Sequence, residues 1–222
     1  MRLFALFLLA VIATGCETFD TPPDTDVETF GGEEIRTGRV AIVVSDSFYV
    51  DDLGGVNAHI ARTGDPAEGY RAFFEADLVR QFAAQTELTA FVAASPEYES
   101  IVGSTEPVPG ERVVTGDEEA DYVLFLDRVR LFRAKYQTGG GMMGAPGPNG
   151  VPSFGGSGTQ RAIRHNVDVL LWDNTRGARL AKGRVESEET LSLIQMPSRG
   201  AYTAAIGEIV EKLADNTQIV RR

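Results

Sequence analysis

"VDVLLWDNTRGARLAKGRV", residues 167–185, decides the fold class of this chain. Before "DNTRG", residues 173–177, Val167, Val169 and Leu171 alternate with Asp168, Leu170 and Trp172, so one set is wholly apolar, as in a strand that buries one face. Glycine adopts positive φ without strain, so Gly177 favours a tight turn at this point. The stretch therefore predicts a hairpin whose second strand runs from Leu180 to about Leu193.

Three further strands are predicted upstream of the hairpin. Their sequences are "RVAIVVS" at residues 39–45, "ELTAFVAAS" at residues 87–95 and "ADYVLFLDRVRLFRAKYQ" at residues 120–137. In the longest of them, strict alternation would place four residues of one parity on one face. These residues are Val123, Phe125, Val129 and Leu131.

Two amphipathic helices complete the pattern. Apolar residues recur every four residues from Tyr70 to Phe82, after a helix start signal at Asp65. A second apolar stripe lies within residues 198–216, where Ser198 is a suitable N-cap. The order of elements predicts an α/β fold, a two-layer sandwich in which two main helices cover one face of the sheet. We expect the sheet to be mixed and mostly antiparallel, with about five strands.

The N-terminal sequence predicts export. Residues 1–16, "MRLFALFLLAVIATGC", have one positive charge, an apolar stretch and then small residues, the layout of a signal peptide. The apolar stretch has roughly half of the ~20 residues that a spanning helix needs. We expect residues 1–15 to be a signal peptide and the acidic, proline-containing residues 16–38 to be a flexible tether. Residues 39–216 would then form a single domain, and residues 217–222 a C-terminal tail.

Cys16 is the only cysteine, and several roles compete for it. A disulfide within the chain would need a second cysteine. A catalytic thiol would need a base, and neither histidine is near it in sequence. A buried structural thiol fits poorly beside the polar "ETFDTPPDTD" of residues 17–26. Lipid attachment is therefore the favoured role.

"ATGC", residues 13–16, resembles the lipobox of bacterial lipoproteins, in which small residues precede a cysteine that is acylated on sulfur. Ala13 replaces the commoner leucine. The resemblance implies a lipid anchor such as palmitate on Cys16, and hence a membrane as partner. Glu17 stands where an aspartate often retains lipoproteins at the inner membrane. The resemblance therefore implies the periplasmic face of the outer membrane, within the bacterial cell envelope.

"RVAIVV", the first helix, "ADYVLFLDRVRLF" and the hairpin together resemble the N-terminal domain of TolB. A loose group of envelope lipoproteins shares this domain, including the curli-secretion lipoprotein and the activators of penicillin-binding proteins. Arg176 separates Thr175 from Gly177, which departs from the adjacent pair common in that hairpin. The order of elements also resembles the auxiliary lipoproteins of lipid-transporting ABC systems. Both resemblances imply a non-enzymatic protein with an envelope partner.

Basic residues gather in the strands. Residues 121–184 hold ten basic and four acidic residues, a balance of +6 in a chain whose net charge is −11. In one interpretation a basic sheet face binds an anionic surface; in the other, these side chains cover the solvent side and edges of strands. The candidate partner contacts are Arg128, Arg130, Arg164, Arg179 and Lys182. The acidic balance of the whole chain argues against nucleic-acid binding.

A glycine-rich segment, residues 138–160, interrupts two of the strands. It holds nine glycines and three prolines, which predicts a disordered hairpin tip because such a segment cannot repay the entropy of ordering. In the alternative interpretation, Met142, Met143 and Phe154 are apolar contacts in a loop that orders against a partner or membrane.

The sequence offers no motif for catalysis, a metal or a cofactor. His59 and His165 lack ligands at metal-binding spacing, and a solvent-facing or hydrogen-bonded role is favoured for His165. We therefore expect no enzyme and no catalytic, cofactor or metal site. The sequence predicts a lipid-anchored periplasmic scaffold that assists an envelope assembly or transport system. The alternative is an ABC auxiliary lipoprotein that binds a lipid or small molecule in an apolar pocket between sheet and helices.

Overall fold

The computed structural model describes residues 24–61, 63–94, 96–101, 103–138, 158–191 and 197–222. The predictions for Cys16, Met142, Met143 and Phe154 lie outside these residues and stay predictions. The chain divides into two compact units, and the body described below comprises Pro23–Ala134 and Gln160–Arg222. The other described residues, at the ends of two strands, belong to the second unit.

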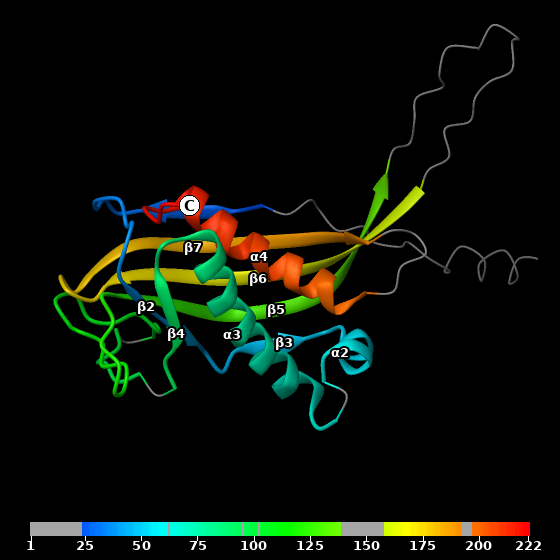
Figure 1. Cartoon of the computed structure of the whole chain (residues 1–222), viewed down its shortest axis with the longest axis horizontal. Coiled ribbons are helices and arrows are strands. Elements are labelled where there is room, and N and C mark those ends of the chain that lie inside the picture. The colour runs from blue at the N-terminus through cyan, green and yellow to red at the C-terminus, as the bar shows by residue number, and fades with distance from the viewer. Residues whose placement is uncertain (1–23, 62, 95, 102, 139–157, 192–196) are drawn as a thin grey trace, which may run out of the picture. The chain divides into compact units, whose positions relative to one another are not determined.

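The described strands form one mixed sheet (Figure 1). Its order is β1 (Asp26–Thr29), β7 (Ala178–Leu191), β6 (Gly158–Asp173), β5 (Tyr122–Thr138), β2 (Arg39–Val44) and β4 (Thr89–Val92), with β3 (Phe48–Val50) also paired to β5. β7 pairs antiparallel with β1 and β6, whereas β2 pairs parallel with β4 and β5, and β3 parallel with β5. The mixed sheet is confirmed, and β1 and β3 bring the strands in the described residues to seven.

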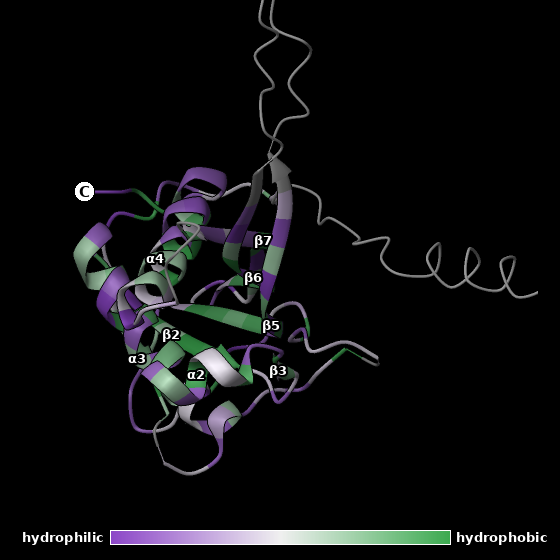
Figure 2. Cartoon of the chain, turned by 90° about the vertical axis from the view of Figure 1, so that its right-hand side faces the viewer, coloured by the Kyte–Doolittle hydropathy of each residue, from purple (hydrophilic) through white to green (hydrophobic). Residues whose placement is uncertain are grey.

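Two long helices, α3 (Pro66–Gln85) and α4 (Arg199–Asn216), cover one face of the sheet (Figure 2). The short helix α2 (Leu53–His59) follows β3. The side chains of Asp65 and Ser198 accept hydrogen bonds from N–H groups in the first turns of α3 and α4, which confirms both predicted caps. The two-layer architecture is confirmed. No helix in the described residues is both long and apolar enough to cross a membrane.

The β6–β7 hairpin forms as predicted. Gly177 has a φ of +62°, and a Cβ at this position would lie 2.4 Å from the backbone carbon of Gly110, so the turn requires glycine. Asn174 in the same turn accepts a hydrogen bond from the Val113 N–H at 2.6 Å and donates to the Ala120 carbonyl at 2.9 Å. The turn therefore also anchors the long connection between β4 and β5, called the β4–β5 loop below.

A bulge in β5 changes which residues share a face. Arg128 has a φ of +45°, and the register with the parallel neighbours of β5 slips between Leu126 and Val129. Both of these residues join the core beneath the helices although their parities differ, whereas Phe125 faces the other side. The predicted common face of Phe125 and Val129 is wrong, because strict alternation fails at the bulge.

Two segments that were expected outside the domain are part of it. From Asp24 onward the predicted tether is folded, and its strand β1 pairs with β7. Ile35 is 3% exposed; its N–H donates to the Gln218 carbonyl at 2.8 Å, and it forms a bridge with Ile219 in the predicted tail. Both predictions are wrong here because isolated apolar residues find their buried partners only in the folded chain.

Candidate functional site

The sheet face opposite α3 and α4, called the open face, is covered by the β4–β5 loop at one end. There the loop packs over a small apolar cluster that includes Phe125, Leu170 and Trp172. Trp172 Nε1 donates a hydrogen bond to the Glu111 carbonyl at 3.3 Å. Both long helices lie on the opposite side of the sheet (Figure 2), so the open face is accessible for binding.

A groove of about 1030 Å³ lies on the open face. Strands β1, β5, β6 and β7 line it together with residues 103–106 of the β4–β5 loop. Phe125 and Leu170 line it but are only 4% and 5% exposed, so its accessible surface comes mainly from charged residues of all four strands and the loop. The volume is at the upper end of the range that is usual for ligand sites.

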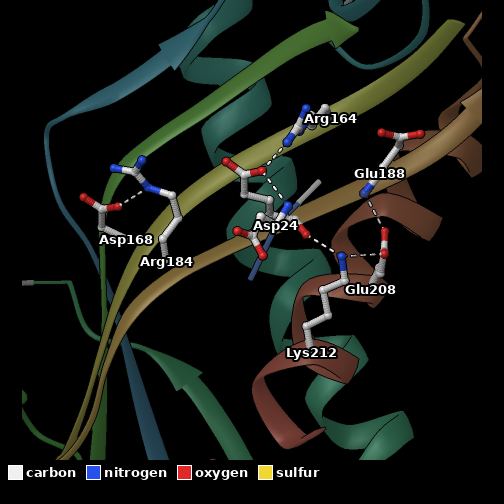
Figure 3. Close-up of polar contacts among 8 residues, drawn as sticks. Asp24, Arg164, Asp168, Arg184, Glu188, Glu208 and Lys212 are labelled. Carbon is white, nitrogen blue, oxygen red and sulfur yellow. Dashed lines mark hydrogen bonds and ion pairs between the residues drawn. The ribbon is translucent and has the colours of Figure 1, made fainter. Parts of the chain in front are cut away.

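Charges of alternating sign cross the open face from strand to strand. Asp26 in β1 is opposite Arg184 in β7, which is opposite Asp168 in β6. Arg184 Nε donates to Asp168 Oδ1 at 2.9 Å (Figure 3), and Arg128 in β5 forms an ion pair with the same carboxylate. The hydrogen bond with Asp168, followed by its charge, raises the pKa of Arg184. Opposite charges directly across neighbouring strands stabilise the register of the sheet.

Glu106 brings a buried carboxylate from the β4–β5 loop onto β7. The residue is 6% exposed, and its two carboxylate oxygens lie 2.8 Å from Arg179 Nη2 and 3.2 Å from Lys182 Nζ. A carboxylate that is removed from water requires such partners. Charge therefore ties the loop to the sheet at this end of the groove.

Arg164 and Glu186 form an ion pair in which both side chains are largely buried (Figure 3). Glu186 also accepts a hydrogen bond from the Asp24 N–H at 2.9 Å, just before β1. The Phe132 ring lies 5.7 Å from the guanidinium of Arg164 and 5.2 Å from that of Arg130. One aromatic ring therefore contacts a cation from β5 and a cation from β6 beyond the groove.

The five cations that were predicted as partner contacts lie on the open face, and each has a carboxylate partner. The pairs are Arg128–Asp168, Arg130–Asp51, Arg164–Glu186, Arg179–Glu106 and Lys182–Glu106. Three of the carboxylates come from outside residues 121–184, so the local excess of +6 in the sequence does not become a basic surface. The open face is a surface of mixed charge, and contact between these five residues and a partner stays a prediction.

Beyond the end of β1, side chains of α4 form hydrogen bonds with the backbone at the edge of β7. Lys212 Nζ donates to the Glu186 carbonyl at 2.6 Å, and Glu208 accepts the Glu188 N–H (Figure 3). Lys212 Nζ also lies 3.0 Å from Glu208 Oε1. Because these groups occupy the donor and acceptor positions of a neighbouring strand, they protect this edge from pairing with another chain.

His165 lies between the sheet and the helices and is fully buried. Its Nε2 is 2.5 Å from Tyr70 Oη, and its Nδ1 is 3.3 Å from Ser187 Oγ. Burial lowers the pKa of His165 to about 3, so the ring is neutral near pH 7. The expected hydrogen-bonded role is confirmed, and a solvent-facing position is excluded.

A second set of hydrogen-bonded polar side chains lies close to His165. Tyr202 Oη donates to Asp52 Oδ2 at 2.7 Å, and Arg133 Nε is 2.8 Å from Asp52 Oδ1. The rings of Tyr202 and Tyr70 are 5.7 Å apart, and burial raises the pKa of both. These side chains occupy part of the space where a carrier would hold its ligand, and the groove lies on the other face. The described residues contain no group of three potential metal ligands.

Several lining residues carry no signal in the sequence. Glu106 lies in the β4–β5 loop and Glu186 lies in β7. The neighbouring sequence of neither residue contains a motif that indicates a site. Asp26 is within "TDVET", residues 25–29, where weak alternation could have indicated β1. The groove depends on contacts between segments far apart in the chain.

No protein-family model and no curated protein matches this chain. Solved structures with a similar arrangement include a PelC dodecamer from Paraburkholderia phytofirmans, with a TM-score of 0.40 and 15% identity over 86% of this chain and 98% of that chain. The hypothetical protein CT253 from Chlamydia trachomatis has a TM-score of 0.37 and 14% identity over 81% of this chain and 97% of that chain. Similarity at this level leaves the function open, and the resemblance to the TolB domain stays a prediction.

Proposed function

We propose that this protein is a lipid-anchored accessory protein of the bacterial envelope that binds a protein partner on its open face. The observation that carries the proposal is the groove of about 1030 Å³ on a sheet face that the long helices leave uncovered. The export signal and the lipobox-like "ATGC" support an envelope location. The partner would belong to an assembly or transport system.

The chemistry of the groove favours recognition over catalysis. Phe125 and Leu170 line the groove but are buried, so charged residues supply most of its accessible surface, as in the polar part of a protein interface. Arg128 and Arg184 both pair with Asp168, so the charged groups of the groove are arranged as ion pairs that a partner can contact.

The anchor would concentrate the protein where its partner is. Each buried methylene of an acyl chain contributes about 0.8 kcal/mol, so two or three chains on Cys16 would hold the domain on a membrane durably. Confinement to a surface raises the effective concentration of a partner on the same surface. The proposed location is the periplasmic face of the outer membrane.

Photocrosslinking in intact cells tests the binding surface. A photoreactive amino acid at Arg128 or Lys182, whose side chains are 66% and 49% exposed, should yield the same crosslinked protein. The control position is Glu211 on α4, which is 47% exposed on the other side of the sheet and should not yield it. Equal crosslinking from Glu211, or none from either groove position, would contradict the proposal.

Acyl labelling tests the anchor separately. Cys16→Ser removes the acceptor sulfur, so we expect the loss of acyl labelling and of membrane association, with the folded domain unchanged. Fractionation of cells and mass spectrometry of the mature protein measure both. An unmodified Cys16 thiol in the native protein would contradict lipid attachment.

A further inference from the structure

Three carboxylates of the groove, those of Asp24, Asp26 and Asp127, form no ion pair within the described residues. Asp127 accepts a hydrogen bond from Ser45 Oγ at 2.5 Å, and the other two are exposed at β1. All three cations that line the groove are held by carboxylates, and they are Arg128, Lys182 and Arg184. An incoming cation would therefore meet unpaired carboxylates, whereas an incoming anion would have to break an existing pair.

The folding of β1 brings the groove close to the proposed anchor. Asp24 lines the groove, and the difference 24 − 16 gives eight residue steps back to Cys16. Eight steps span at most about 28 Å when fully extended. A tether that continued to Arg39 would span about 80 Å. Only a short stretch of chain therefore separates the β1 side of the groove from the proposed anchor.

Charge argues against two occupants that the protein itself could supply. Residues 17–23, which precede the groove, contain two acidic residues and no basic one. A second copy of the chain brings a net charge of −11. Both would be repelled by unpaired carboxylates.

We infer that the groove receives a lysine- or arginine-rich segment of a partner protein at the membrane surface. The inference rests on the proposed function, because its location depends on the anchor at Cys16. Cationic side chains of the segment pair with Asp24, Asp26 and Asp127. The partner is a membrane protein with a basic segment next to the bilayer, within reach of the short tether.

Peptide binding to the full-length protein in neutral detergent micelles tests the charge requirement. The probes are fluorescent peptides of about twelve residues, one lysine-rich and one glutamate-rich. Fluorescence anisotropy should detect binding of the lysine-rich peptide, weakening as salt is added, and none of the glutamate-rich peptide. Equal binding of the two peptides would overturn the inference.

A matched pair of variants locates the binding. The groove variant combines Asp24→Asn, Asp26→Asn and Asp127→Asn, which keeps the side-chain shapes and should weaken binding of the lysine-rich peptide about tenfold. The control variant combines Glu33→Gln, Glu87→Gln and Asp117→Asn at exposed positions that do not line the groove. It changes the net charge equally and should alter binding less than about twofold. Equal weakening in both variants would overturn the inference, with circular dichroism confirming that each variant is folded.

The outcomes separate this inference from the proposed function. If the crosslinks from Arg128 and Lys182 persist in the groove variant at wild-type yield, the open face binds a partner but its unpaired carboxylates do not select it. Vesicles of phosphatidylglycerol test whether the groove binds anionic lipid headgroups. Binding of the full-length Cys16→Ser protein to these vesicles through the groove would replace a basic protein segment with lipid headgroups and overturn the inference.

Discussion

The apolar cluster between the sheet and the helices α3 and α4 contains 34 buried residues in the described part of the chain. The apolar cluster on the open face contains nine. The rest of the open face is held by ion pairs such as that of Arg184 with Asp168, whose side chains are 52% and 16% exposed. Burial of apolar area contributes about 25 cal/mol per Å², while an exposed ion pair contributes about 0 to 1 kcal/mol. The helix-covered face therefore supplies most of the stability.

This difference explains how one sheet can be both stable and adaptable. Exposed charges on the open face, such as Arg128 and Arg184, can change at small free-energy cost, because solvent screens them. A substitution beneath the helices leaves a cavity that the packed core cannot fill. A surface that recognises a partner is thus separated from the residues that maintain the fold.

The largest expected effect is the loss of an aromatic ring beneath the helices. Phe74 is fully buried, and its ring centroid is 5.6 Å from that of Phe48 and 5.7 Å from that of His165. Phe74→Ala should lower the free energy of unfolding by about 3–4 kcal/mol in urea titrations. Phe132→Ala on the open face is the control and should lower it by about 1 kcal/mol. Equal losses would erase the distinction between the faces.

A pH-dependent loss of stability should come from the same core. The pKa of His165 is about 3 in the folded protein and about 6.5 in the unfolded chain, so the unfolded chain binds more protons between these values. The free energy of unfolding should therefore fall as the pH drops below about 6.5, by about 2 kcal/mol between pH 7 and pH 5.

His165→Gln should remove this part of the pH dependence, because glutamine does not titrate. Urea titrations at pH 7 and pH 5 measure the change, and the carboxylates common to both proteins cancel in the comparison. His59→Gln is the control and should retain the wild-type dependence. A His165→Gln protein with the wild-type dependence would show that another group is responsible.

Detachment of β1 should have a smaller and local effect. A Cβ on Gly183 would lie 2.0 Å from the Asp26 carbonyl oxygen and 2.6 Å from the Val27 Cα, so Gly183→Ala must displace β1. We expect at least about tenfold faster amide hydrogen exchange at Glu28, which belongs to a hydrogen-bonded pair with Lys182 of β7, and a loss of about 1 kcal/mol in the free energy of unfolding. Gly200→Ala, whose Cβ would meet only Ser198 Oγ at 3.6 Å, is the control and should not affect β1. Unchanged exchange at Glu28 in the Gly183 variant would contradict the prediction.

The smallest effect is expected from the charge ladder. Asp168→Asn keeps the shape of the side chain but removes the charge that Arg128 and Arg184 share. We expect a loss of about 0.5–1 kcal/mol in the free energy of unfolding, decreasing as salt is added. A loss as large as that of Phe74→Ala would show that the open face also determines stability.

Most of the fold, but little of the site, is predictable from sequence. The helix from Pro66 and the turn at Gly177 follow from local chemistry, since a cap or a turn involves residues a few positions apart. The face assignment in β5 fails because the positive φ of Arg128 has no signal in residue type. The acidic partners of the groove are also unpredictable, because Glu106 meets Lys182 across 76 residues of chain.

By itself, the sequence determined five of the strands, the two long helices and the caps of those helices, because periodicity and turn chemistry act over short stretches of chain. It also placed the lipobox-like cysteine at residue 16. Only the tertiary structure decided that β1 pairs with β7, that the candidate cations are paired with carboxylates, and that a groove with unpaired carboxylates lies on the open face. These features depend on which distant residues meet, and a charge or an isolated apolar residue carries no information about its partner's position.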